Sequence, residues 1–190
     1  MTILPASAIL VVRKVGIFIK VRNMALCGLF AALLALCAWL SFPLGDAAIT
    51  LQTFGIFLCL GVLGGKRGTA AIFVYLLLGA AGLPVFSGFR GGIGALLSTT
   101  GGYLTGFLAC GLLYWLLTAF KTPSLPAMAA GLLLCYCFGS FWYYTIYIES
   151  GSAVTVGFII LKCVLPYLLP DAIKLFLAWR LSQKLKRFVY

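Results

Sequence analysis

The run NMALCGLFAALLALCAWLSFPLG, residues 23–45, contains no charged residue. A helix needs about 20 apolar residues to cross the roughly 30 Å hydrocarbon layer of a membrane, so this run is long enough to span it. Pro43 and Gly45 near its end predict that the helical part covers residues 24–42. The stretch therefore predicts a transmembrane helix.

Charge-free runs recur along the rest of the chain, which has 190 residues, 64% of them hydrophobic and 9% charged. No soluble core of this size could bury so much apolar surface. The other predicted spans cover residues 51–64, 68–82, 101–120, 127–148 and 171–186. A short helix is predicted over 151–165, and Pro166 and Pro170 are expected to break it before the last span. The expected fold class is an all-α membrane protein with six transmembrane helices.

Basic residues mark one set of helix ends. Numbering the ends alternately places these residues on one side: Arg13, Lys14, Lys20, Arg22, Lys66, Arg67, Lys121, Lys184, Lys186 and Arg187. The other side carries Asp46, Arg90 and Glu149. The positive-inside rule makes the first side cytoplasmic, so both termini are predicted to be cytoplasmic. The net charge of +11 is thus a topology signal and predicts no nucleic-acid partner.

The first 23 residues place an apolar stretch before their basic residues, the reverse of a secretory signal. We interpret residues 1–23 as a basic leader or interfacial segment, and a start at Met24 is the alternative. Residues 24–187 then form the membrane domain, and residues 188–190 form a tail.

Several kinds of chemistry are excluded. The chain has no histidine, which removes the commonest general base and zinc ligand. Its seven cysteines fall in or beside apolar stretches and are interpreted as buried hydrophobic residues. The segment GVLGGKR, residues 61–67, lacks the spacing and the Ser/Thr of a phosphate loop. We therefore predict no metal, no cofactor and no enzymatic activity.

Two charges stand inside the last predicted span. Burying Asp171 and Lys174 at mid-depth costs roughly 2.5 to 3.5 kcal/mol each on insertion scales. Their presence in the span therefore indicates a structural or functional role. Their spacing places them on one helix face. They form either a polar ligand site or an internal ion pair near the membrane boundary.

Further candidates lie at the predicted outer ends. The segment LPVFSGFRGGIGALLSTT, residues 83–100, is too rich in glycine for a lipid-facing helix, and its Arg90 could bind a carboxylate. Gln52, at a helix start, offers a donor and an acceptor. The aromatic residues that could wall an apolar cavity are Phe86, Phe89, Tyr103 and Tyr167.

Small residues recur along the first predicted helix, at Gly28, Ala31, Ala32 and Ala35. Such spacing lets another helix approach closely. The partner is either a helix of the same chain or a separate subunit.

Four segments appear in a characteristic order. They are ALCGLFAALLAL (25–36), ITLQTFGIFLCLGVLGGKRG (49–68), VYLLLGAAGLPVFSGFRGGIGALLSTTGGYLTGF (74–107) and VLPYLLPDAIKLFLA (164–178). Together they closely resemble the BioY family, the biotin-specific S components of energy-coupling-factor (ECF) vitamin transporters. The resemblance covers about residues 24–180, and one departure is Ser98-Thr99, where the family usually has Gly-Pro.

The resemblance implies a six-helix S-component bundle in the cytoplasmic (inner) membrane. It implies binding and uptake of biotin, together with a transmembrane coupling protein and two ATPase subunits. Family binding residues carry over to Gln52, Tyr103, Asp171 and Lys174. The family's docking pattern on the first helix matches Ala31 and Ala35, next to Gly28.

Other readings stay open. The closest is an S component for another vitamin, such as thiamine or riboflavin. A membrane-embedded enzyme and a non-transporting scaffold are more distant alternatives. The sequence leaves open whether the subunit works alone, as a homo-oligomer or only with partners, and which cation meets the biotin carboxylate.

Overall fold

The computed structural model describes residues 6–44, 47–149 and 155–189 and is predominantly helical. Its helices are α1 (Ala6–Trp39), α2 (Gln52–Ala80), α3 (Ile93–Leu96), α4 (Gly101–Ala119), α5 (Ser124–Glu149), α6 (Val156–Ile159) and α7 (Leu165–Val189). A 3-10 turn covers Ser87–Phe89, and a π-helical turn covers Ile160–Val164. Strands β1 (Ser41–Leu44) and β2 (Ala47–Thr50) form a hairpin.

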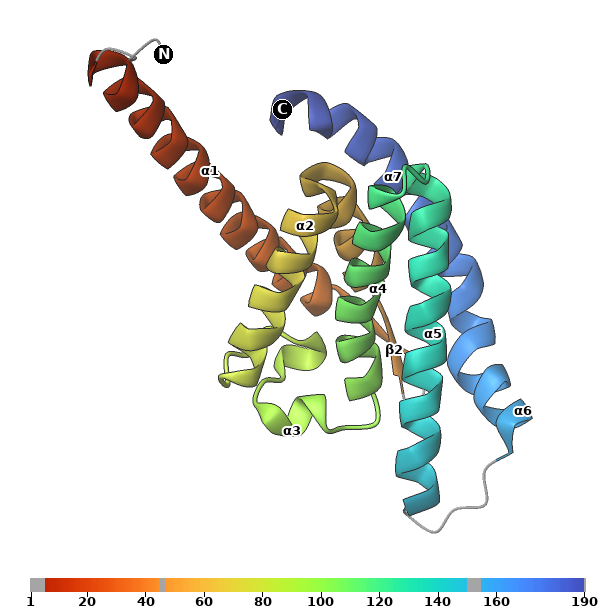
Figure 1. Cartoon of the computed structure of the whole chain (residues 1–190). Helices are drawn as coiled ribbons and strands as arrows, with labels where there is room; N and C mark the ends of the chain where they lie inside the picture. Colours follow the sequence, from red (N-terminus) through yellow and green to blue (C-terminus); the bar gives the residue numbers. More distant parts are fainter. Residues whose placement is uncertain (1–5, 45–46, 150–154, 190) are drawn as a thin grey trace.

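Helix α2 is two helices joined at a sharp break. Gly64 has φ 77° and ψ 170°, a conformation that is essentially restricted to glycine. The chain doubles back there, as Figure 1 shows. A Cβ added to Gly68 would lie 2.9 Å from the Cα of Leu60, so the two arms touch. With α1, α4, α5 and the α6–α7 unit, the arms confirm the predicted count of six helices.

Length and composition agree with a membrane location. Within the described residues, four helical stretches are long and apolar enough to cross a membrane: Lys20–Trp39, Gln52–Ala80, Gly101–Ala119 and Ser124–Ile148. The chain is therefore a multi-pass membrane protein.

The predicted break before the last helix is wrong. Helices α6 and α7 are joined through the π-helical turn, and helix α7 continues through Pro166 and Pro170. Membrane helices tolerate proline where a local π adjustment and neighbouring helices satisfy the freed backbone groups. Residues 151–154 of the predicted short helix lie outside the described residues.

The β-hairpin was not predicted. Helix α1 ends at Trp39 instead of residue 42, and Ser41 pairs with Thr50 in the antiparallel register. The amide of Leu51 donates to the carbonyl of Leu40 at 3.1 Å and closes the base of the hairpin. Asp46, expected on the outer side, lies outside the described residues.

Helix α2 lies at the centre and contacts α1, α4 and α7, while α4 packs along α5. In Figure 1 both ends of the chain lie at the same end of the molecule as the α2 break and the α4–α5 turn. Helix α3 and the end of α5 lie at the opposite end, and the hairpin lies between the two ends, behind α4 and α5. This division matches the predicted partition of charges, since Lys66 and Lys121 belong to the first end and Arg90 to the second.

The division of the chain at residue 23 stays a prediction. Helix α1 runs without interruption from Ala6 through Met24. Of the predicted tail 188–190, residue 190 lies outside the described residues.

Candidate functional site

A cavity of about 230 Å³ lies beside the hairpin, whose Thr50 helps to line it. Its walls come from the start of α2, the segment 83–100, α4, α5 and α7. The structure brings all five predicted site residues to this cavity: Gln52, Arg90, Tyr103, Asp171 and Lys174. Residues that lie up to 122 positions apart in the sequence thus meet in one place.

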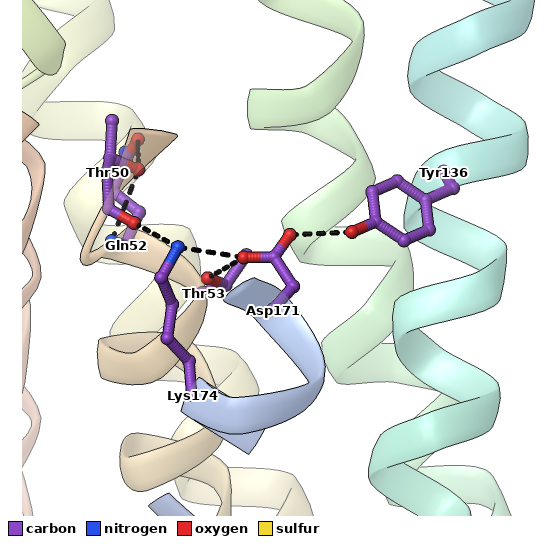
Figure 2. A network of polar contacts seen from close by, with 6 residues as sticks. All are labelled: Thr50, Gln52, Thr53, Tyr136, Asp171 and Lys174. Carbon is purple, nitrogen blue, oxygen red and sulfur yellow. Dashed lines mark hydrogen bonds and ion pairs between the residues drawn. The ribbon is translucent and has the colours of Figure 1, made fainter. Parts of the chain in front are cut away.

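Asp171 is the centre of the polar wall, and it is buried with 5% of its surface exposed. Its Oδ1 accepts hydrogen bonds from Thr53 Oγ1 at 2.8 Å and from Lys174 Nζ at 2.9 Å. Its Oδ2 accepts one from the hydroxyl of Tyr136 at 2.7 Å (Figure 2). Three helices therefore hold this carboxylate.

Lys174 links helix α7 to the hairpin. Its Nζ donates to the carbonyl of Thr50 at 2.8 Å and forms the ion pair with Asp171. The internal ion pair expected as one alternative is therefore present, and both of its residues also line the cavity, so the ligand-site interpretation stays a prediction.

Gln52 begins a second set of polar contacts. Its Nε2 donates to the hydroxyl of Tyr75 at 2.8 Å, and Tyr75 in turn donates to the carbonyl of Val85 at 3.2 Å. The hydroxyl of Thr50 donates to Gln52 Oε1 at 3.3 Å. Gln52 is 5% exposed, so its amide is held by the protein at the cavity wall.

Arg90 is exposed at the edge of the cavity. Its Nε donates to the carbonyl of Ser87 at 3.2 Å. Phe86 lines the cavity as expected, but Phe89 does not, because its ring stacks on Trp39 with 5.0 Å between the ring centroids. The expectation for Phe89 is therefore wrong.

Tyr103 belongs to α4, and its hydroxyl donates to the carbonyl of Cys163 at 3.3 Å. Tyr167 lines the cavity, as predicted. Sequence reasoning missed Tyr136 and Tyr143, which also line it. Helix α5 contains several tyrosines, and no spacing in the sequence distinguishes the two that face the cavity.

Ser87 and Thr100 also line the cavity, and most of the remaining wall is apolar, with Leu104, Phe107 and Leu132 among its residues. The cavity can therefore hold a small molecule that has hydrogen-bonding groups on one side and hydrocarbon on the other. Among the described residues, no cluster of His, Cys, Asp and Glu could hold a metal ion.

The small residues of α1 fall on two faces. Ala31 and Ala35 are buried in the core, at 2% and 6% exposure. Gly28 and Ala32 are exposed, and a Cβ added to Gly28 would meet nothing within 4 Å. The exposed pair with small-xxx-small spacing is therefore Gly28 and Ala32.

Fold and site together define a multi-pass helical membrane protein with a cavity between its helices that has a polar and an apolar wall. The chain matches the BioY family over residues 10–190. It therefore belongs to the BioY family, as the resemblance of its motifs predicted.

Individual relatives agree with this assignment. The chain is 40% identical over 169 residues to the biotin transporter BioY of Thermotoga maritima, which covers 87% of this chain and 96% of the relative. It is 35% identical over 167 residues to the probable biotin transporter BioY of Pyrococcus horikoshii, and this match covers 88% of this chain and 98% of the relative. A crystal structure of the S-component for biotin from an ECF-type ABC transporter matches with a TM-score of 0.78 and 25% identity. The match covers 88% of this chain and 92% of that structure's chain.

Proposed function

We propose that this chain binds biotin and serves in its uptake as the substrate-binding S component of an ECF-type transporter. The observation that carries the proposal is the convergence of Gln52, Arg90, Tyr103, Asp171 and Lys174 on one cavity in a chain of the BioY family. The relatives above that are named biotin transporters support it.

The polar wall suits the ureido ring of biotin, which has two N–H donors and one carbonyl acceptor. A carboxylate has about four acceptor positions, and the structure uses three on Asp171, so one can accept a ureido N–H. An ammonium has three donors, and Lys174 uses two. Its third can donate to the ureido oxygen.

The valerate carboxylate needs a cation, and Arg90 suits it. The guanidinium has five N–H donors, of which the structure shows one bonded to Ser87. In this arrangement the carboxylate end of biotin would lie at the cavity edge beside Arg90, and the thiophane ring would lie among the apolar residues of the lining.

Calorimetry of the purified protein with biotin, biotin methyl ester and thiamine tests this proposal. We expect tight stoichiometric binding of biotin and weaker binding of the ester. Equal binding of the ester would remove the role of a cation at the carboxylate. Binding of thiamine instead of biotin would assign the chain to another vitamin, and a folded protein that binds none of them would favour the scaffold alternative.

Energy for uptake has to come from other subunits. The break at Gly64 is a helix reversal inside α2, and residues 61–67 lack the Ser/Thr of a phosphate loop. We propose a transmembrane coupling protein and two ATPase subunits as partners in the cytoplasmic (inner) membrane. The docking face that we propose on α1 comprises Gly28 and Ala32, because Ala31 and Ala35 are buried within the chain.

A further inference from the structure

Tyr75 lies behind the cavity wall and does not line it. It belongs to the second arm of α2 and is only 1% exposed. Its hydroxyl accepts a hydrogen bond from Gln52 Nε2 at 2.8 Å and donates one to the carbonyl of Val85 at 3.2 Å. One oxygen atom thus joins a cavity residue on the first arm of α2 to the segment after α2.

That segment carries Arg90. Phe86, next to Val85, meets the Tyr75 ring edge-on, with 5.6 Å between the ring centroids and an interplanar angle of 84°. Its ring fills the space beside Gly79, where an added Cβ would clash with it. The amide of Phe86 donates to the carbonyl of Arg90 at 2.9 Å, in an isolated antiparallel bridge.

A second contact holds the same segment from the other side. The indole of Trp39 donates to the carbonyl of Pro84 at 2.9 Å. Two consecutive carbonyls, those of Pro84 and Val85, are therefore fixed by side chains of α1 and α2. The Arg90 backbone is fixed through Phe86.

We propose that the Tyr75 hydroxyl is a positioning group for substrate selection, which couples the amide of Gln52 to the placement of Arg90. The inference rests on the proposed function, in which Arg90 binds the substrate carboxylate. Packing alone would need only the ring of Tyr75, whereas the buried hydroxyl is retained with a specific partner on each side. Losing the hydroxyl would loosen the segment that presents Arg90 and free the Gln52 amide to rotate.

The test compares four variants of the full chain with the wild type: Tyr75→Phe, Arg90→Gln, the double variant, and the control Tyr114→Phe. Tyr114 is a tyrosine of α4 that is equally buried, at 2% exposure, and does not line the cavity. Thermal unfolding shows whether each variant is folded.

The first measurement is amide hydrogen exchange over residues 83–92 without any ligand. We expect exchange in this segment to rise severalfold in Tyr75→Phe and to be unchanged in Tyr114→Phe. Unchanged exchange in Tyr75→Phe would overturn the link between the hydroxyl and the segment, whether or not the protein binds biotin.

The second measurement is the affinity for biotin and for its methyl ester. In Tyr75→Phe we expect biotin to bind about fivefold more weakly, as for one lost hydrogen bond, with the ester much less affected. The ratio of the affinity for biotin to the affinity for the ester should be the same in the double variant as in Arg90→Gln alone. Equal losses for both ligands, or additive losses in the double variant, would overturn the role in selection. A wild-type chain that binds no biotin would overturn the proposed function itself and this role with it.

Discussion

Asp171 is a carboxylate buried within a membrane protein, and its neighbours explain how it is tolerated. A buried charge is stable only where it is paired and its remaining positions are hydrogen-bonded. Lys174 supplies the opposite charge, while Thr53 and Tyr136 satisfy the other positions. The protein's own side chains therefore hold this carboxylate in place.

Replacing either member of this pair should abolish tight biotin binding. In Asp171→Asn the amide no longer balances the ammonium of Lys174, and in Lys174→Ala the carboxylate is left with two hydroxyl partners. Breaking a buried ion pair typically costs about 3–5 kcal/mol. We expect both variants to lose at least about 100-fold in affinity by calorimetry while still folding.

The matched control is Lys184→Ala. Lys184 belongs to the last part of α7, on the predicted cytoplasmic side, and does not line the cavity. The affinity of the Lys184→Ala variant for biotin should equal that of the wild type. Affinity near the wild-type value in both site variants would remove Asp171 and Lys174 from the binding site.

At the scale of elements, the sequence predicts the helices better than their ends. Charge-free runs locate the first five spans because hydrocarbon excludes charges, and Lys66-Arg67 marks the reversal in α2. Proline rules derived from isolated helices fail at Pro166 and Pro170, because the π-helical turn and the neighbouring helices are tertiary features. The hairpin escapes prediction for a similar reason, since its short strands are fixed by pairing with one another.

The candidate site follows the same logic. Polar residues are conspicuous in an apolar sequence. The sequence alone therefore identifies Gln52, Arg90, Asp171 and Lys174 as candidates. Tyr75 and Tyr136 could not, because a tyrosine in a membrane helix is equally compatible with packing or a lipid interface. Their roles depend on which residue lies across the helix contact.

A substitution at Gly64 tests how much the reversal of α2 depends on glycine. The φ of 77° and ψ of 170° at this position are strained for any residue with a Cβ. We expect Gly64→Ala to lower the free energy of unfolding by about 1–3 kcal/mol. Thermal unfolding in detergent measures this loss.

Gly94→Ala is the control for that substitution. A Cβ at Gly94 meets nothing within 4 Å, and its φ is not in the positive region. Its midpoint of unfolding should stay close to that of the wild type. An equal midpoint in Gly64→Ala would contradict the strain argument.

The exposed face of α1 gives a prediction for partner docking. A tryptophan in place of Ala32 would prevent close approach of a second helix without entering the core. We expect Ala32→Trp to impair copurification with the coupling protein and biotin uptake, and to leave biotin binding unchanged. The control is Leu112→Trp on α4, at a side chain that is 49% exposed. Normal complex formation by Ala32→Trp would exclude this face as the dock.

On the scale of the whole molecule, the cavity lining and the basic helix ends are separated along the long axis. Both termini and the α2 break lie at one end, while α3, in the segment 83–100 that helps to line the cavity, lies at the other (Figure 1). Helix α2 connects the two ends and touches α1, α4 and α7. The proposed binding cavity and the basic helix ends thus share one central element without sharing residues.

The pairing of Asp171 with Lys174 has a consequence for the rates of binding. The two charges cancel inside the cavity, so among the described residues that line it the unbalanced charge is that of Arg90, which is exposed. An anionic ligand is then attracted at the entrance, and such attraction between exposed charges is screened by salt. Stopped-flow measurements should find that biotin associates more slowly as ionic strength rises, whereas its dissociation from the buried polar wall changes little. Salt would thus control how often a ligand arrives, and the buried network would control how long it stays.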